Sequence, residues 1–288
     1  MVKQSTLDQY KRKIDQLERQ KIPFKARPKK ALEMLRSHYQ APRSFKNYVA
    51  SILSAHKHGI IHLNKKVVDI YRKEIEVVEK QLRDNMDEQV MSDKQKENWL
   101  SRGEWLEVHK RMKRKGAFPE TMSGHRDAQR HLLYLLYTKL PPQRNIYRTV
   151  YFTPTDAPNT LDLNQGIFTF RDHKTSDGSE STHYQLHLTS MDGIKSIIQE
   201  ILRIREVLQL RKDVLLLNQC NRAMNQNIYK CELGHVFGKN IGSTQLRTMF
   251  LSELVDVKED TTEKARKELA KMMGHSRQVQ NFYVKQME

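Results

Sequence analysis

The chain has 288 residues, with 51 Lys and Arg against 34 Asp and Glu, a net charge of +17 and a mean hydropathy of −0.76. No apolar stretch reaches the ~20 residues that a membrane helix needs, and the polar start Met1–Tyr10 is unlike a secretory signal, so we expect neither a membrane partner nor secretion. A positive charge of this size makes a polyanion the expected partner.

The basic charge is shared between the two parts of the chain. Residues 1–100 hold 22 Lys and Arg and 13 Asp and Glu, a net of +9, and the remaining residues carry a net of +8. This distribution predicts that both parts lie against the same polyanion. A generally basic surface without such a partner is the alternative that charge alone leaves open.

Cysteine and histidine patterns exclude several classes of site. Cys220 and Cys231 form neither a CxxC pair nor a disulfide framework, which favours a reducing, intracellular setting. The twelve histidines follow no metal-binding spacing such as HExxH. The sequence also contains no glycine-rich phosphate loop. We therefore expect no metal and no cofactor.

The first elements are helices separated by a basic linker. Thr6 and Gln9 form a capping box ahead of apolar residues at helical spacing, which predicts a helix through Leu17. The linker Lys21–Lys30 contains two prolines.

Three more helices follow in the first ninety residues. We expect a short one near Ala31–Tyr39, a second that Ser44 caps and Gly59 stops, and a longer one that Asn64 caps. Their apolar stripes are typical of a packed core. Residues 1–90 are therefore predicted to form a helical bundle, whose basic charge suits a polyanion such as DNA.

A polar stretch, Asp84–Asn98, marks the predicted boundary between two domains. Trp99 and Trp105 are expected in the first packed turns of the second domain, residues 91–288. The basic run His109–Lys115 is open to three interpretations: a DNA contact, an import signal or a solvated face.

The second domain mixes helices with a small sheet. An apolar helix, Leu132–Leu140, is halted by Pro141 and Pro142. Three β-like runs follow, Thr149–Thr153, Ile167–Arg171 and His183–Thr189. The last two flank a turn rich in Gly, Ser and Asp, so they are predicted to form an antiparallel hairpin.

Helices are predicted again to the end of the chain. They cover Ile194–Leu210, Gln245–Leu254, Glu263–Met273 and a last segment that carries Tyr283, with Gly274 as the stop of the third. The expected fold class is therefore α+β and mostly helical, with a small antiparallel sheet.

Four places in the second domain carry residues suited to phosphate chemistry. Arg144 follows the Pro-Pro break, Lys174 lies near the tip of the predicted hairpin, and Arg247 lies in the segment Thr244-Gln245-Leu246-Arg247 that opens a helix. The fourth place is Met273-Gly274-His275-Ser276, with Tyr283 eight residues past the histidine. Each motif alone is weak, whereas all four in this order are considerably more specific.

These segments, in this order and on these elements, resemble the tyrosine recombinase (phage-integrase-like) family. The resemblance covers roughly residues 95–288, and the helical N-terminal part is similar to that family's core-binding domain. The segments around Leu132–Tyr147 and Gly274–Tyr283 look most like versions from large DNA viruses and eukaryotic mobile elements. The resemblance implies a mixed α/β catalytic domain, double-stranded DNA as partner and a homotetramer on DNA.

The chemistry of the residues agrees with that resemblance. Two arginines suit the negative charge that grows on a phosphate during nucleophilic attack, because each guanidinium can fork two oxygens, and Arg144 and Arg247 are the candidates. Tyr283 is the candidate nucleophile, with its phenol of pKa about 10 activated in part by those charges. The resemblance implies that Lys174 protonates the leaving 5′-oxygen and that His275 assists at a nonbridging oxygen or in proton movement.

The chain departs from the family pattern in several places, two of which concern the predicted catalytic residues directly. Thr244 stands where the family often has a histidine, three residues before the second arginine, so His235 or His173 is a candidate substitute as proton acceptor. The spacing from His275 to Tyr283 is one residue shorter than is common. One residue turns a helical side chain by ~100°, so Tyr283 would need a local kink to reach the site.

Ordinary structural roles also remain open for each residue. Arg144 and Lys174 are compatible with surface charges, Gly274 and His275 with a helix end, and Tyr283 with core packing.

The sequence thus predicts a site-specific recombinase or integrase of a virus or mobile element, which cleaves and rejoins DNA through a 3′-phosphotyrosyl intermediate. It would act with DNA inside a cell, in a host nucleus or at a viral replication site. Two alternatives stay open: a type IB topoisomerase-like nicking and closing enzyme, and an inactive relative that only binds DNA.

Overall fold

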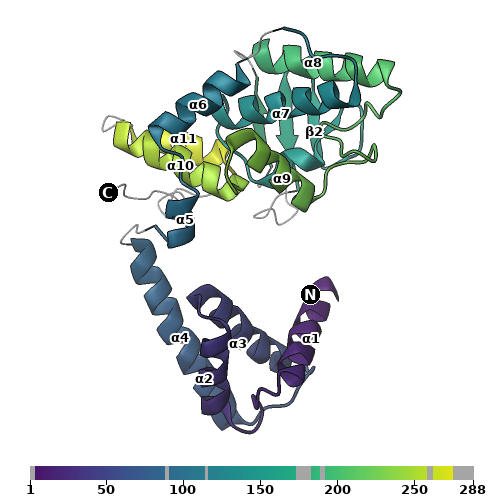
Figure 1. Cartoon of the computed structure of the whole chain (residues 1–288). Coiled ribbons are helices and arrows are strands. Elements are labelled where there is room, and N and C mark those ends of the chain that lie inside the picture. The colour runs from purple at the N-terminus through teal and green to yellow at the C-terminus, as the bar shows by residue number, and fades with distance from the viewer. Residues whose placement is uncertain are drawn as a thin grey trace. The chain divides into compact units, whose positions relative to one another are not determined.

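The computed structural model describes residues 4–87, 91–113, 116–172, 183–188, 192–257 and 262–274. The chain divides into two compact units, Met1–Val90 and Met91–Glu288, and each is described here by itself (Figure 1). No helix in these described ranges is both long and apolar enough to cross a membrane.

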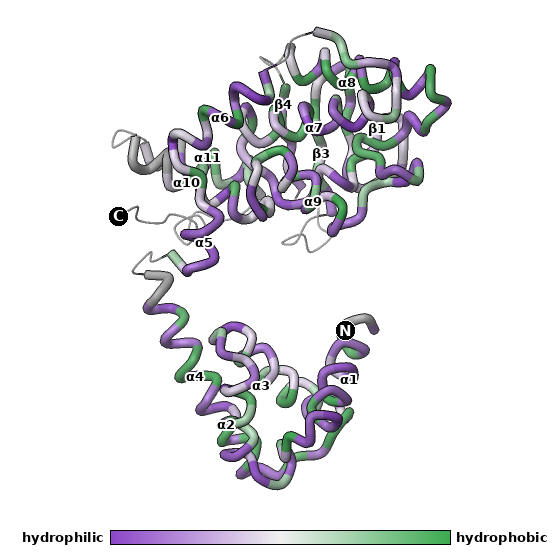
Figure 2. Tube along the Cα trace, in the orientation of Figure 1, coloured by the Kyte–Doolittle hydropathy of each residue, from purple (hydrophilic) through white to green (hydrophobic). Residues whose placement is uncertain are grey.

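The first unit consists of helices in its described part, and each helix turns an apolar face inward. The helices are α1 (Gln4–Arg19), α2 (Pro28–His38), α3 (Pro42–Lys57) and α4 (Lys65–Asp87). Apolar and polar residues are interspersed along them in Figure 2, as amphipathic helices require. Leu17, Leu35 and Ile52 are fully buried in their shared core. The hydroxyl of buried Tyr71 donates to the Phe24 carbonyl at 2.8 Å, which fixes the linker between α1 and α2 to α4.

Helix starts in the first unit partly correct the sequence predictions. The side chain of Asn64 accepts a hydrogen bond from the Val67 amide at 2.9 Å, so the predicted cap of α4 is confirmed. Thr6 and Ser44, in contrast, lie inside α1 and α3 and cap neither. Helix α3 begins at Pro42 because proline is pre-set for a first helical turn and lacks the amide that a cap would satisfy.

The second unit packs its helices around a small sheet. Its helices are α5 (Asp93–Glu97), α6 (Arg102–Met112), α7 (Met122–Thr138), α8 (Asp192–Val207), α9 (Gln226–Phe237), α10 (Ser243–Val257) and α11 (Glu263–Met272), with a 3₁₀ helix η1 (Asn145–Thr149). Helix α7 packs against both α8 and α9 (Figure 1). Its residues Leu132 and Leu136 share one hydrophobic core with Phe168 and Phe170 of the sheet.

The sheet is mixed, which corrects the predicted antiparallel sheet. Its strands lie in the order β1 (Tyr151–Phe152), β2 (Asn159–Asp162), β3 (Ile167–Phe170) and β4 (Tyr184–His187). The predicted hairpin is confirmed, because β3 and β4 pair antiparallel with Phe168 opposite Leu186. However, β1 pairs with β2 in parallel. Strand β2 escaped prediction because it has only four residues and they show no alternation of buried and exposed positions.

Candidate active site

The described residues include two of the five predicted site residues. Arg144 lies directly before η1 with a partly buried side chain, and Arg247 lies on α10 and is 1% exposed. Lys174, His275 and Tyr283 lie outside the described residues, as does His173. Of the remaining candidates, His235 is exposed on α9 and Thr244 is exposed on the first turn of α10.

Arg247 joins two segments that the sequence singled out separately. Its Nη1 donates to the carbonyl of Pro142 at 3.1 Å and to the carbonyl of Met273 at 2.9 Å. Pro142 precedes Arg144 by two residues, and Met273 precedes His275 by two residues. The buried guanidinium therefore holds the backbone before Arg144 close to the end of α11.

The backbone around Arg144 is fixed by hydroxyl groups. The Tyr137 hydroxyl lies 3.0 Å from the Gln143 carbonyl oxygen and 3.2 Å from the Arg144 carbonyl oxygen. The Tyr229 hydroxyl lies 2.8 Å from the Tyr137 hydroxyl. The Ser243 hydroxyl donates to Oδ1 of Asn145 at 3.0 Å. Helices α7, α9 and α10 therefore all contribute to holding this turn.

Gln143 makes a second link between the same two segments. Its side chain is fully buried, and Nε2 donates to the carbonyls of Pro141 at 2.8 Å and Met272 at 2.7 Å. Its Oε1 accepts a hydrogen bond from the Tyr184 hydroxyl at 2.9 Å. The two carbonyl partners require this orientation of the amide, since only nitrogen can donate to them, and the Tyr184 hydroxyl is then the donor to Oε1.

Gly274 is confirmed as the stop of α11, and its place also requires glycine. Its φ of +65° is a left-handed conformation that L side chains rarely adopt, and its amide donates to the Lys271 carbonyl at 2.9 Å. A Cβ on Gly274 would lie 2.9 Å from Cε1 and from the hydroxyl oxygen of Tyr184. The chain thus leaves α11 directly against the Tyr184 ring, one residue before His275.

The charges of Arg247 and Arg144 both affect the pKa of the Tyr184 phenol. Burial raises the pKa of the Tyr184 phenol well above its ordinary value, and the guanidinium groups of Arg247 and Arg144 oppose that rise. Burial likewise raises the pKa of Tyr137 and Tyr147, again against Arg247. These tyrosines are therefore protonated at neutral pH, and Arg144 and Arg247 act on the same small region.

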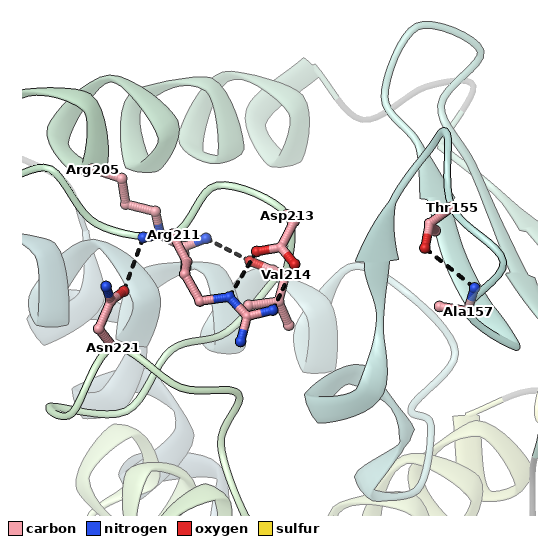
Figure 3. Close-up of polar contacts among 7 residues, drawn as sticks. All are labelled: Thr155, Ala157, Arg205, Arg211, Asp213, Val214 and Asn221. Carbon is pink, nitrogen blue, oxygen red and sulfur yellow. Dashed lines mark hydrogen bonds and ion pairs between the residues drawn. The ribbon is translucent and has the colours of Figure 1, made fainter.

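A second buried arginine lies elsewhere in this unit. Arg205 of α8 is fully buried; its Nε donates to Nε2 of His125 at 3.0 Å, and its Nη2 donates to Oε1 of Gln129 at 3.1 Å and to the Leu215 carbonyl at 2.9 Å. Its Nη1 donates to the Val214 carbonyl, beside the surface pair Arg211–Asp213 (Figure 3). Burial lowers the pKa of Arg205 to about 9, and burial and the charge of Arg205 lower that of His125 to about 4.

Pocket shape alone would have pointed away from the predicted site. A cavity of about 680 Å³ opens between α7, α9 and the loop before α9, lined among others by Met122, His125, Met224, Ile228 and Cys231. Of the predicted site residues that the structure describes, neither Arg144 nor Arg247 lines it. Among the residues that the structure describes, no three His, Cys, Asp or Glu side chains are grouped to hold a metal ion.

Comparison with known proteins gives structural neighbours only. No protein-family model and no curated protein matches the chain. The crystal structure of XerA recombinase is similar at 11% identity, over 100% of this chain and 89% of that one, with a TM-score of 0.45. The structure of XerH site-specific recombinase bound to difH substrate, a pre-cleavage complex, is similar at 18% identity, over 84% and 68%, with a TM-score of 0.44. The functional proposal therefore rests on the residues described above.

Proposed function

We propose that this protein is a site-specific DNA recombinase that cleaves and rejoins DNA through a 3′-phosphotyrosyl intermediate, with Tyr283 as nucleophile. The observation that carries the proposal is the double link between the Arg144 turn and the end of α11. Arg247 and Gln143 each bind one carbonyl from each segment, and the chain beyond the end of α11 carries His275 and, eight residues later, Tyr283.

The proposed reaction begins with attack of the Tyr283 phenolic oxygen on a DNA phosphorus atom. The bond from phosphorus to the 5′-oxygen breaks, and Lys174 supplies the proton that the leaving oxygen needs. Arg144 and Arg247 stabilise the negative charge on the nonbridging oxygens, with His275 as a further donor. Religation reverses these steps, as a 5′-hydroxyl attacks the phosphotyrosyl ester and releases the phenol. The phosphotyrosyl ester conserves the energy of the broken phosphodiester bond, so the reaction in this scheme needs no ATP or other nucleotide cofactor.

Double-stranded DNA fits the distribution of charge. Both parts of the chain carry a net positive charge, +9 for residues 1–100 and +8 for the remainder, so phosphate contacts would dominate the affinity. Exchange between two cleaved duplexes requires four active sites, and a homotetramer on DNA is therefore part of the proposal. Such a substrate places the protein with DNA inside a cell, in a nucleus or at a viral replication site.

A nicked suicide duplex tests the proposal. A nick beside the scissile phosphate lets the short leaving strand diffuse away, so a covalent intermediate accumulates. Because the target sequence is unknown, the probe is a pool of nicked duplexes with a randomised central segment. We expect an adduct that survives denaturing electrophoresis with the wild type and none with Tyr283→Phe, which keeps the ring and loses the attacking oxygen.

The outcomes separate the alternatives. No adduct with the wild type on any member of the pool would contradict the proposal and favour a protein that only binds DNA. An adduct accompanied by relaxation of supercoils, without recombinant products from the selected sequence, would favour a nicking and closing enzyme.

A further inference from the structure

The segment that ends in Arg144 and the end of α11 are held together in register. Two consecutive carbonyls from each segment take part, those of Pro141 and Pro142 and those of Met272 and Met273. Gln143 binds the first of each pair, and Arg247 binds the second of each pair. A slip of one segment by one residue would break both bridges.

All the polar atoms of the buried Gln143 side chain take part in hydrogen bonds. A buried amide is costly unless its donors and acceptor are paired, and here Nε2 has two carbonyl partners and Oε1 has the Tyr184 hydroxyl. Tyr184 in turn lies against Gly274, where a Cβ would come within 2.9 Å of its ring. The three residues therefore fix where the chain leaves α11.

We propose that Gln143, supported by Tyr184, is a positioning residue that sets the distance between the Arg144 turn and the chain that leads to His275 and Tyr283. This inference rests on the proposed function and adds residues to which the resemblance assigns no role. Both Nε2 donors of Gln143 are bonded to backbone carbonyls and its Oε1 to Tyr184, so it acts through the backbone that it binds rather than by contact with DNA.

The consequence is a selective effect on the chemical step. An error of about 1 Å in the placement of a reacting group costs on the order of 100-fold in rate, while contacts that only bind substrate are unaffected. Loss of the Gln143 bridge should therefore slow cleavage of bound DNA and leave the affinity for DNA almost unchanged.

Gln143→Met is the first variant, because methionine keeps the length and burial and removes both donors and the acceptor. Gln129→Met is its matched control. Gln129 is also a buried glutamine that bridges backbone and side-chain groups, to Leu217 and Arg205, outside the predicted site. Tyr184→Phe is a milder variant that removes one hydroxyl and serves if Gln143→Met does not fold.

The measurement is single-turnover adduct formation at saturating DNA, on a sequence selected from the nicked pool, beside the Kd for the same duplex. We expect Gln143→Met to slow adduct formation about 100-fold with Kd within about threefold of the wild type. Tyr184→Phe should slow it less, and the double variant should be no slower than Gln143→Met, because both changes break one chain of hydrogen bonds. Gln129→Met should lower the unfolding temperature and leave the rate of the folded protein unchanged.

Failure of this inference and failure of the proposed function give different results. If the wild type forms the adduct and Gln143→Met forms it at a rate within a few-fold of the wild type, or loses no more than Gln129→Met, the positioning role is wrong and the recombinase proposal stands. If the wild type itself forms no adduct, the proposed function fails, and the positioning role fails with it.

Discussion

Two buried arginines in the second unit show how similar burial can serve different ends. Arg205 and Arg247 are 0% and 1% exposed, and both donate to backbone carbonyls. Arg205 binds the Val214 and Leu215 carbonyls and two side chains of α7, so it fastens one loop to two packed helices. Arg247 instead connects two chain segments that each precede a predicted catalytic residue. Burial alone therefore does not distinguish the two arginines, whereas the segments that each of them connects do.

The largest expected effect distinguishes the two arginines by chemistry. Arg247→Lys keeps a positive charge but loses the planar fork, so adduct formation should fall by roughly 10³-fold or more, with DNA affinity changed only a few-fold. The check is the single-turnover rate on the nicked duplex, with circular dichroism to establish that the variant is folded. A loss below about tenfold would show that Arg247 is structural, like Arg205.

Arg205→Met should affect stability instead. Methionine leaves the Val214 and Leu215 carbonyls without their side-chain donor and removes one of the two donors to the Gln129 oxygen, which keeps the Leu217 amide. The loss should lower the free energy of unfolding by about 3–4 kcal/mol. Urea unfolding measures the loss. For the protein that remains folded at low temperature, the rate of adduct formation should stay within about threefold of the wild type. A rate loss as large as that of Arg247→Lys would mean that the two arginines do not differ in role.

The pH dependence of stability tests the Arg205 region separately. His125 has a pKa of about 4 in the folded chain, against about 6.5 when unfolded, so between these values the unfolded state binds more protons. The free energy of unfolding should therefore fall as the pH drops from about 6.5 to about 4, by up to about 3 kcal/mol from this group. Urea unfolding measured at several pH values in that range should show that the free energy of unfolding depends less steeply on pH in His125→Gln. His187→Gln, on an exposed position of β4, should keep the wild-type slope. Equal slopes for all three proteins would contradict the assignment.

The smallest expected effect is on stability and concerns Gly274, at the end of α11 that Arg247 binds. Gly274→Ala forces a left-handed alanine and a Cβ against Tyr184, which should lower the free energy of unfolding by about 1–2 kcal/mol. Gly103→Ala is the matched control, because nothing lies within 4 Å of its Cβ position on α6, and it should be neutral or slightly stabilising. Thermal unfolding of both variants measures the difference. Equal unfolding temperatures would mean that Tyr184 and Gly274 do not constrain each other.

Regular local patterns were predictable from the sequence where apolar spacing and turn residues coincide. The cap of α4 by Asn64, the hairpin of β3 and β4, and the stop of α11 at Gly274 all follow from such coincidences. The start of helix α7 was predicted ten residues too late, at Leu132 instead of Met122, because polar His125 and Gln129 occupy the buried face of its first half. Helix α9 was not predicted at all, although Asn225 caps it.

Long-range polar contacts were not predictable in the same way. Arg205 falls on the apolar stripe of α8, four residues after Ile201, and that position was a usable sign of burial. Its partners on α7 were not, since no spacing pattern relates segments about eighty residues apart. Gln143 adjoins Arg144 in the chain, yet its link to Met272 depends on tertiary packing between segments 129 residues apart.

The identity of the nucleophile is the central claim, and Tyr184 is its most serious competitor, because both arginines act on its phenol. The direct measurement is tryptic digestion of the adduct trapped on the nicked duplex, followed by mass spectrometry of the DNA-linked peptide. We expect linkage to residues 278–285, the tryptic peptide between Arg277 and the cleavage after Lys285, which contains Tyr283. A linkage on the peptide that contains Tyr184 would contradict it.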